Sequence, residues 1–465
     1  MKRILLIVYL LAIIAAAAIS IYFLPRFFVW REIEIRNRQN SVSLDFSLAT
    51  DDKEGKTEKI FLPFFEEKKE LLFSQGKDFI EINLWEMKVR VYKGGLLAKE
   101  APILLRGDDA NWGGTAAGIY SVLTGYKNAY SVISEVYMPW SLRFYGKYYL
   151  HGKPYYPDGR PLDSPYSGGC LHLSNDDAQA IYELAEKGMP VLVIDKPQDG
   201  FRYPEKEESQ FPEISAKSYL VADLDSGFVF KQKEAETILP LASLTKLMTA
   251  IVVAENIDLT KSITIGEKML EAYGFTEGLE VGKSFRVVEL FYPLLIESSN
   301  DSAEVLSYFL GRERTIKMMN EKAKAILMEK TNFVCPSGYA PENVSSAKDL
   351  FYLARYILNN RPVLFEITKG KMVRTFGEMS FDVTKLWNKN VFVNDPTFIG
   401  GKTGFILASR YNGLFVFRLT TKEGTERRLA IIILGSENEE LDTQKIYRWL
   451  LDNYFVLSEG SESQN

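Results

Sequence analysis

The sequence predicts a multidomain protein with an N-terminal transmembrane helix, a mostly-β domain, and then a domain that mixes strands with helices. Three observations support this prediction. An uncharged apolar run fills Ile4 to Leu24. Short alternating segments dominate from Phe79 to Leu150, and helical periodicity of an apolar kind begins only after Ser243. The chain of 465 residues has room for roughly two or three domains.

The N-terminal run is long enough to span a membrane. About 20 apolar residues cross a bilayer as a helix, and this run exceeds a typical signal-peptide core. Lys2 and Arg3 precede it and favour a cytoplasmic N-terminus with export of everything that follows. Small residues from Ala15 to Ala18 keep signal-peptide cleavage open as an alternative. We expect residues 1–28 to form a retained, single-pass anchor in the cytoplasmic membrane.

The composition limits the possible partners. A hydrophobic content of 46% with 25% charged residues indicates folded domains, and a net charge of −5 without a long basic run argues against nucleic acid. Only two histidines and two cysteines are present, too few for an ordinary zinc site, so we expect no metal and no cofactor. His151 and His172 flank Cys170. An oxidising exterior would allow a disulfide with Cys335, but the two cysteines fall in different predicted domains, which favours free thiols.

The region after the anchor divides into two parts. Residues 29–76 are charged and uneven, and we expect a membrane-proximal segment with some strand. Residues 77–196 form the first domain, in which strand-like segments continue to Leu150. A helix is expected over Asn175–Lys187, and the strand Pro190–Ile194 closes this domain.

A second domain follows a linker. Residues 197–212 have the proline, glycine and charge content of a linker, residues 213–455 form the second domain, and 456–465 have the composition of a disordered tail. The strands expected in the second domain are Ser218–Leu224, Phe228–Lys231, Phe415–Leu419 and Leu429–Leu434. The expected helices follow Ser243, cover Val288 to Leu310, and cover Asp442 to Tyr454.

Three short motifs in fixed order give the second domain its candidate chemistry: Ser243-Leu-Thr-Lys246, Ser298-Ser-Asn300 and Lys402-Thr403-Gly404. Serine is a weak nucleophile at neutral pH and needs a base within hydrogen-bond reach. On a helix, Lys246 lies on the same face as Ser243, about 5–6 Å away at Cβ. Burial in the apolar helix expected there would lower the pKa of the lysine, so that it can act as a base. A serine at a helix N-terminus also has backbone N–H groups available for a developing oxyanion.

One Ser-x-x-Lys match alone is weak evidence, because roughly two are expected by chance in a chain of this length. Three imitations are present: Ser74…Lys77, Ser345…Lys348 and Ser436-Glu-Asn438. A helix cap or a surface hydroxyl is the simpler interpretation of each serine alone. Ser243 differs because it opens an apolar helix, because Ser298-Ser-Asn300 falls within a helical pattern, and because the single Lys-Thr-Gly stands between glycine and an aromatic residue. The ordered trio therefore favours a catalytic site.

The sequence around these motifs resembles the low-molecular-mass penicillin-binding proteins of the D-alanyl-D-alanine carboxypeptidase type, over about Ile214 to Phe455. The matching segments are Ala216-Lys-Ser-Tyr-Leu-Val, Ile238-Leu-Pro-Leu-Ala-Ser-Leu-Thr-Lys-Leu-Met-Thr-Ala, Ser298-Ser-Asn-Asp-Ser-Ala, Thr331-Asn-Phe-Val-Cys-Pro-Ser-Gly and Gly401-Lys-Thr-Gly-Phe. The resemblance implies an α/β fold with an antiparallel sheet flanked by helices, plus a helical subdomain. This chain departs from the family pattern in one respect, because we expect no separate C-terminal β domain and no amphipathic anchor, and we expect the N-terminal helix to replace that anchor.

The resemblance further implies a role for each matching residue. Ser243 would be the acylated nucleophile and Lys246 its base. Ser298 and Asn300 would serve proton relay and positioning. The implied substrate-binding residues are Lys402, which would bind the substrate carboxylate, and its neighbours Thr403, Gly404 and Phe405. The backbone N–H groups of Ser243 and Phe405 would form the oxyanion hole. Cys335 stands where the family more often has a polar residue.

A second candidate nucleophile lies in the first domain, in the pattern His151…Ser167-Gly-Gly-Cys170. This spacing suits an imidazole that deprotonates a thiol across a loop, and a thiol paired with histidine has a depressed pKa and is the reactive form. Glycines before the cysteine let backbone N–H groups approach an oxyanion. For an isolated pair, a buried structural cysteine and a surface histidine would be the simpler interpretation.

The surroundings of Cys170 resemble the L,D-transpeptidase catalytic domain over about residues 77 to 196. The matching segments are Phe79-Ile-Glu-Ile-Asn-Leu, Gly114-Thr-Ala-Ala-Gly-Ile-Tyr, Met138-Pro-Trp-Ser-Leu-Arg-Phe, Leu150-His-Gly152 and Ser167-Gly-Gly-Cys-Leu-His-Leu-Ser. The resemblance implies Cys170 as nucleophile and His151 as base, with Ser167 and Gly169 beside the substrate. That family usually has Ser-His-Gly-Cys followed by a hydrophobic residue and arginine. Here Gly168 replaces the histidine and His172 the arginine, so acylation is chemically feasible while substrate positioning stays open.

Together the resemblances imply a membrane-tethered bacterial cell-wall enzyme whose two acyl-transfer sites are extracytoplasmic, in the periplasm or on the outer face. The serine site would remove the terminal D-alanine from pentapeptide stems of peptidoglycan, and the resulting tetrapeptide is the acyl donor that L,D-transpeptidases use. β-Lactams would be inhibitors. Two alternatives stay open: D,D-endopeptidase activity at Ser243, and a cell-wall-binding or β-lactam-sensing scaffold with an inactive cysteine domain. Intact Lys246 and Lys402 favour an active serine site.

Overall fold

The computed structural model describes residues 65–108, 112–164, 166–205, 207–271, 276 and 278–456. These residues belong to a single unit that extends from Glu58 to the C-terminus. The expected anchor at residues 1–28 lies outside the described residues, as do most of the expected membrane-proximal segment and the tail after Val456. No helix in the described part of the chain is long and apolar enough to cross a membrane.

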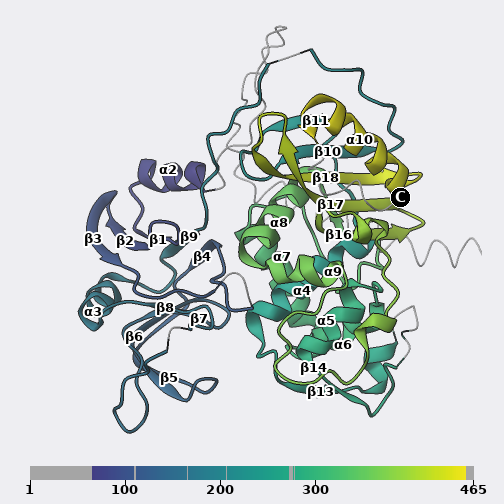
Figure 1. The fold of residues 1–465 in the computed structure, drawn as a ribbon. Coiled ribbons are helices and arrows are strands. Elements are labelled where there is room, and N and C mark those ends of the chain that lie inside the picture. Colours follow the sequence, from purple (N-terminus) through teal and green to yellow (C-terminus); the bar gives the residue numbers. More distant parts are fainter. Residues whose placement is uncertain are drawn as a thin grey trace, which may run out of the picture. The chain divides into compact units, whose positions relative to one another are not determined.

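The first domain, residues 79–194, contains two sheets (Figure 1). The strands of the five-stranded sheet are, in spatial order, β3 (Leu96–Pro102), β2 (Lys88–Lys93), β1 (Phe79–Asn83), β9 (Pro190–Ile194) and β4 (Gly118–Ser121). Those of the four-stranded sheet are β5 (Thr124–Ser131), β6 (Val136–Tyr145), β7 (Tyr148–His151) and β8 (Leu171–His172). Ile80 and Ile82 of β1 point into the main core of this domain, which confirms the alternating strand that the sequence predicted.

Helix α3 (Asn175–Leu184) begins where the sequence predicted it. The hydroxyl of Ser174 accepts a hydrogen bond of 3.1 Å from the backbone N–H of Asp177 and so caps the helix. The helix ends three residues earlier than expected, at Leu184, while the closing strand β9 has the predicted bounds.

Helix α2 (Glu66–Ser74) lies at the end of the expected membrane-proximal segment, while the short alternating pieces that predicted some strand there lie outside the described residues. Its sequence, Glu-Glu-Lys-Lys-Glu-Leu-Leu-Phe-Ser, is rich in strong helix formers, although no helix was expected here. Leu72 packs against Phe79 and Leu192, on the face of the sheet opposite the main core of the first domain.

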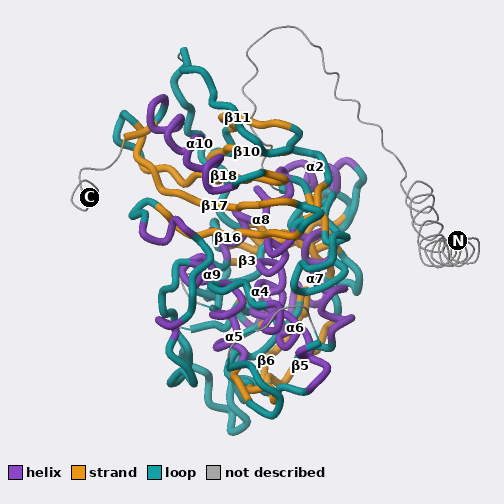
Figure 2. The backbone as a smooth tube through the Cα atoms, turned by 90° about the vertical axis from the view of Figure 1, so that its right-hand side faces the viewer, coloured by secondary structure: helices purple, strands orange, loops and turns teal. Residues whose placement is uncertain are grey.

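The second domain, residues 218–456, is built on an antiparallel sheet (Figure 2). Its strands lie in the order β11 (Val229–Lys233), β10 (Ser218–Asp223), β18 (Glu426–Ser436), β17 (Arg410–Thr421) and β16 (Phe398–Ile406), with β19 (Phe455–Val456) paired to β17. Along β18, Ile432 joins a hydrophobic cluster with helix α8 (Ala347–Asn360), whereas Ile431 and Ile433 join another with α10 (Glu439–Asn453). Helices therefore flank both faces of the sheet, as the resemblance implied.

The remaining helices form a helical subdomain in which α4 to α7 contact one another (Figure 1). Their bounds are η1 (Ala242–Leu244), α4 (Thr245–Asn256), η2 (Glu267–Leu270), α5 (Val287–Leu295), α6 (Asn300–Tyr308), α7 (Arg312–Ala325), α9 (Pro362–Thr368), η3 (Val383–Lys385) and η4 (Val391–Asn394). Two small antiparallel pairs of strands complete the domain: β12 (Leu239–Pro240) with β15 (Val344–Ser345), and β13 (Ser262–Thr264) with β14 (Ser284–Arg286).

The continuous helical pattern expected over Val288 to Leu310 is wrong in one respect. The chain forms two helices, α5 and α6, and Ser298 lies between them with a φ of +63°. This left-handed backbone conformation is uncommon for a residue other than glycine. Ser299 caps α6 by accepting a hydrogen bond of 2.9 Å from the N–H of Ser302, so the second motif starts a helix rather than continuing one.

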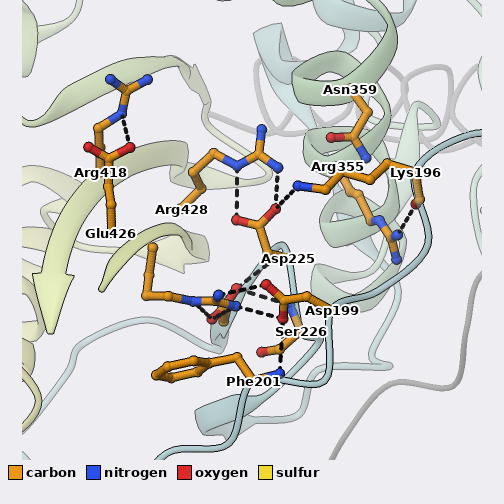
Figure 3. A network of polar contacts seen from close by, with 12 residues as sticks. Lys196, Asp199, Phe201, Asp225, Ser226, Arg355, Asn359, Arg418, Glu426 and Arg428 are labelled. Atoms are coloured by element: carbon orange, nitrogen blue, oxygen red, sulfur yellow. Dashed lines mark hydrogen bonds and ion pairs between the residues drawn. The ribbon is translucent and has the colours of Figure 1, made fainter. Parts of the chain in front are cut away.

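The described residues of the expected linker, 197–205 and 207–212, have no helix or strand, but they are attached to the second domain (Figure 3). Asp199 forms an ion pair with Arg427 at 2.6 Å, and Tyr203 is buried and donates a hydrogen bond of 2.7 Å to Asp223. The backbone carbonyl of Lys196 accepts a hydrogen bond of 2.9 Å from Arg355. Buried aromatic and charged contacts of this kind hold the segment in place.

Two candidate active sites

Ser243 lies in the single turn η1, directly before α4. Its neighbour Ala242 has a φ of +50°, a strained conformation that turns the chain sharply into the helix. The loop that contains Gly338 passes so close that a Cβ there would lie 1.9 Å from the carbonyl oxygen of Ala242. Only glycine fits at residue 338, which explains why the Cys-Pro-Ser-Gly segment belongs to this site.

Lys246 is fully buried on the first turn of α4, and its Nζ lies 2.9 Å from the Oγ of Ser243. The same nitrogen donates hydrogen bonds of 2.7 Å to Oδ1 of Asn300 and of 2.7 Å to the carbonyl of Ser337. Burial, followed by the nearby charge of Lys402, lowers the pKa of Lys246 well below its usual value. A neutral amine has two N–H groups for the two carbonyl oxygens and one lone pair, which then faces the hydroxyl of Ser243.

Lys402 lies on β16, across the site, and its Nζ donates a hydrogen bond of 2.9 Å to Oγ of Ser298. Burial, with a further contribution from Lys389, lowers the pKa of Lys402 to about 7. Thr403, Gly404 and Phe405 follow on the same strand. A Cβ at Gly404 would lie 2.9 Å from the backbone nitrogen of Ser243, so this strand passes directly beside the candidate nucleophile. The structure thus brings the three sequence motifs together.

The imitations of the motifs lie in other surroundings. Ser74 is exposed at the end of α2, where its hydroxyl bonds to the carbonyl of Leu71. Ser345 is buried in β15, where its hydroxyl lies 2.7 Å from that of Thr331.

The carbonyl of Ser337 is the contact that sequence reasoning missed. The Pro-Ser-Gly turn was the available signal, but the sequence does not reveal which backbone oxygen faces Lys246.

The second candidate site forms where β7 and β8 pair in parallel, which places His151 opposite His172, with ring centroids 4.6 Å apart. His151 is buried, and its Nδ1 lies 2.7 Å from the carbonyl of Gly152. A carbonyl can only accept, so Nδ1 carries the proton and Nε2 is available as a base. Burial, followed by the proximity of His172, lowers the pKa of His151 to about 3, which keeps this imidazole neutral.

Cys170 directly precedes β8, and its thiol contacts the carbonyl of Lys147 at 3.7 Å. Burial raises the pKa of Cys170 to about 11. This overturns the expectation of a depressed thiol pKa: among the described contacts, no hydrogen bond joins the thiol to His151, and desolvation disfavours a thiolate. Desolvation therefore keeps this thiol in its protonated form beside a neutral imidazole.

The loop before Cys170 is packed tightly at one glycine and open at the other. Gly169 has a φ of +114°, and a Cβ there would lie 2.2 Å from the ring of Tyr148. Ser167 donates a hydrogen bond of 2.5 Å to the carbonyl of Cys170 and fixes the turn. A Cβ at Gly168 would have no heavy atom within 4 Å, so the position where the family usually has histidine has open space here.

A cavity of about 460 Å³ surrounds Cys170, His151 and His172. Residues of both domains line it: Asp258, Leu259, Thr260 and Phe376 of the second domain contribute to its wall. Lys147, which also lines it, donates hydrogen bonds of 3.2 and 3.1 Å to the carbonyls of Ala254 and Ile257 at the end of α4. The cysteine pocket is therefore not complete without the second domain.

Among the described residues, no cluster of histidine, cysteine or carboxylate side chains is arranged to hold a metal ion.

Residues 205–438 match the family model of the D-alanyl-D-alanine carboxypeptidases, peptidase family S11. The chain belongs to this family. Residues 77–193 match the model of the L,D-transpeptidase catalytic domain, so both resemblances drawn from the sequence are confirmed. The two matches support a bifunctional enzyme that joins an S11 serine peptidase to an L,D-transpeptidase domain.

Named relatives match the S11 part of the chain. A D-alanyl-D-alanine endopeptidase of Haemophilus influenzae is 33% identical over 223 residues, which are 45% of this chain and 73% of that protein. The D-alanyl-D-alanine carboxypeptidase DacB2 of Mycobacterium tuberculosis is 30% identical over 203 residues, which are 43% of this chain and 69% of that protein. A solved structure of a D-alanyl-D-alanine carboxypeptidase from Mycobacterium tuberculosis H37Rv is 26% identical and covers 54% of this chain and 97% of that chain, with a TM-score of 0.47.

Proposed function

We propose that Ser243 removes the terminal D-alanine of peptidoglycan pentapeptide stems and that Cys170 uses the resulting tetrapeptide as an acyl donor for cross-linking. One observation supports the first half most strongly. Nζ of Lys246 lies 2.9 Å from Oγ of Ser243 and is held by two carbonyl oxygens, those of Asn300 and Ser337. This is the arrangement that a neutral lysine needs to accept the proton of a serine hydroxyl.

The serine reaction proceeds through an acyl-enzyme. Oγ of Ser243 attacks the carbonyl carbon between the two terminal D-alanines while its proton passes to Lys246. The backbone N–H groups of Ser243 and Phe405 stabilise the oxyanion. When the peptide bond breaks, the proton moves from Lys246 to the amine of the leaving D-alanine, with Ser298, whose Oγ lies 2.9 Å from Nζ of Lys402, as the proposed relay. Water then hydrolyses the ester and regenerates Ser243.

Lys402 suits recognition of the free carboxylate at the end of the stem. Its ammonium is buried, and its hydrogen bond to Ser298 fixes it beside the reacting bond. Thr403 and Gly404 lie next to it on β16, where an extended substrate can align with the strand edge. A charge-assisted contact in a desolvated site is stronger than one at the surface, so the terminal carboxylate defines where the peptide is cut.

The cysteine reaction transfers an acyl group rather than releasing it to water. The thiol of Cys170 attacks the carbonyl that precedes the terminal D-alanine of the tetrapeptide, and Nε2 of His151 accepts the proton. D-Alanine leaves with that proton, and a thioester remains. An amine of a second stem then attacks the thioester, forms the new amide and returns the proton, through His151, to the sulfur. Gly169 and Ser167 shape the turn that faces the thioester oxygen.

Endopeptidase activity at Ser243 is the second candidate, and the likeness to a D-alanyl-D-alanine endopeptidase favours it. Both activities need the same nucleophile, but an endopeptidase cleaves a cross-link, whereas a carboxypeptidase requires a free terminal carboxylate. Mass spectrometry after incubation with purified muropeptides separates them. The proposal expects loss of one D-alanine from pentapeptide monomers. Cleavage of cross-linked dimers without trimming of monomers would instead establish the endopeptidase.

The proposal also includes the cellular site and the inhibitors. Residues 1–28 would anchor the chain in the cytoplasmic membrane with both domains outside, and β-lactams would acylate Ser243. Fluorescent penicillin should label the protein in the membrane fraction of cells. Ser243→Ala should abolish this labelling. Ser74→Ala, which changes an exposed serine in another Ser-x-x-Lys match, should leave the labelling intact. Label that persists in Ser243→Ala would contradict the assignment.

A further inference from the structure

A cavity of about 670 Å³, larger than the one around Cys170, lies between the two domains. Strands β4 and β6 with the turn after β6 line one side, and α7 with the end of α4 lines the other. Its volume falls within the range of pockets that take small ligands. Neither candidate nucleophile lines it, so the acyl-transfer chemistry does not account for it.

The charged side chains of this cavity have one dominant sign. Four cations line it, Arg143, Lys147, Arg314 and Lys317, against a single carboxylate, Glu321. The chain as a whole has a net charge of −5, so this concentration of positive charge is a local feature. The carboxylate of Glu321 lies 3.7 Å from Nζ of Lys317, one helical turn away. This carboxylate therefore pairs with one of the four cations. Clefts lined by one sign of charge concentrate ligands of the other sign.

Arg143 adds an observation of its own. Its Nε is buried and has no hydrogen-bond partner among the described residues. A guanidinium has five N–H donors in a planar fork, and a carboxylate matches that fork with two oxygens. An unsatisfied buried donor costs free energy unless a ligand or solvent pairs with it. Arg143, whose side chain also bonds to Tyr149, therefore brings one unsatisfied guanidinium N–H to the lining of a cationic cavity, as an anionic, oxygen-bearing ligand requires.

Lys147 connects this cavity to the cysteine pocket, because it lines both. Its carbonyl accepts the hydrogen bond of the Cys170 thiol, while its ammonium is tied to the end of α4. A ligand in the larger cavity is thus one residue away from the pocket in which the thioester would form.

We propose that the cationic interdomain cavity binds the carboxylates of the acceptor stem peptide and presents that peptide to the acyl-enzyme at Cys170. The inference rests on the proposed function, since a transpeptidase must hold two peptides at once. The donor occupies the pocket around Cys170, and the acceptor needs a separate site with access to it. Peptidoglycan stems have several free carboxylates, which complement the four cations.

The test measures binding without turnover. Full-length protein with both Ser243→Ala and Cys170→Ala is titrated with a purified tetrapeptide stem by calorimetry, at low and at high salt. Arg314→Glu and Lys317→Glu reverse two exposed charges of the cavity and should together weaken binding about tenfold, since an exposed charge pair contributes up to about 1 kcal/mol. Lys324→Glu is the matched control, because Lys324 is exposed on the same helix but does not line the cavity, and it should bind as the parent does.

A stem whose carboxylates are amidated should bind weakly and should not respond to the charge reversals. Equal affinity in the parent and the double reversal, or no measurable binding in the parent, would overturn the proposal. So would reversal-sensitive binding to phosphatidylglycerol vesicles in place of the stem, which would assign the cavity to lipid. Because both nucleophiles are absent from this protein, failure of either acyl-transfer reaction in the active enzyme does not affect the outcome.

Discussion

Arg361 of the second domain donates a hydrogen bond of 2.6 Å to the phenolic oxygen of Tyr148 in the first domain. Both side chains are fully buried, and Arg361 also forms an ion pair of 3.1 Å with Glu255. The ring of Tyr148 is the group that a Cβ at Gly169 would strike, so it lies directly under the loop that holds Cys170. The second domain thus supports the geometry of the cysteine site.

Arg361→Ala should destabilise the protein by about 3–5 kcal/mol, because it leaves the buried carboxylate of Glu255 with one cationic partner, Lys322, and removes the partner of Tyr148. Chemical denaturation measures this change. Lys385→Ala, at an exposed lysine, should change stability by no more than about 0.5 kcal/mol. Similar stability of the two variants would show that the buried ion pairs of Glu255 with Lys322 and Arg361 contribute little.

Gly404→Ala should slow acylation of Ser243 by penicillin at least tenfold. The added Cβ would lie 2.9 Å from the backbone nitrogen of Ser243, which must move away from the position in which its N–H meets the oxyanion. Stopped-flow measurement of acylation gives the rate. Gly200→Ala, where a Cβ meets nothing within 4 Å, is the control and should retain the parent rate. A normal rate in Gly404→Ala would exclude this close approach as a requirement.

Trimming of pentapeptides should lose substrate affinity as the pH rises through about 7. Lys402 has a pKa lowered to about 7, so the charged form that we propose to bind the terminal carboxylate is lost above that pH. The pKa of Lys246 is held well below its usual value by burial and by Lys402. The KM should therefore rise with pH while kcat changes less. Lys402→Arg, whose charge does not titrate, should show a flat KM over the same range. A flat KM in the parent enzyme would refute the assignment of Lys402.

Cys170 should react slowly with iodoacetamide at neutral pH, because burial raises the pKa of its thiol to about 11. The rate should increase about tenfold per pH unit from pH 7 to 10, whereas an ordinary thiol levels off above its pKa of about 8.5. Cys335→Ala removes the other free thiol from the measurement. A rate that is already maximal at pH 7 would mean that His151 and Cys170 form a preactivated ion pair.

The sequence predicted the elements that depend on local pattern. Pro190–Ile194 is a short β-branched and leucine run, and α3 starts at a serine cap, so strand and helix were recognisable from composition and spacing. The break at Ser298 was not, since serine and asparagine are allowed in a helix and periodicity does not show a left-handed residue. The family model confirms the resemblance, whereas the roles of individual site residues stay predictions.

Contacts between distant segments were beyond sequence reasoning. In the sequence, Lys322 and Arg361 cannot be distinguished from ordinary surface cations. Nothing in their spacing shows that both are buried beside Glu255. The pKa of Cys170 also depends on desolvation by the folded surroundings, and local spacing to His151 gave the wrong direction. Burial is a property of the assembled chain, which a linear pattern does not contain.

Helix α4 has Lys246 of the serine site in its first turn. At its other end, the carbonyls of Ala254 and Ile257 accept hydrogen bonds from Lys147, whose own carbonyl contacts the thiol of Cys170. A helix melts cooperatively rather than one residue at a time. Heat that loosens α4 therefore removes the base from Ser243 and the support from Cys170 in the same event. Thermal inactivation curves of the two reactions should superimpose, so no temperature treatment can yield a preparation with only one of them.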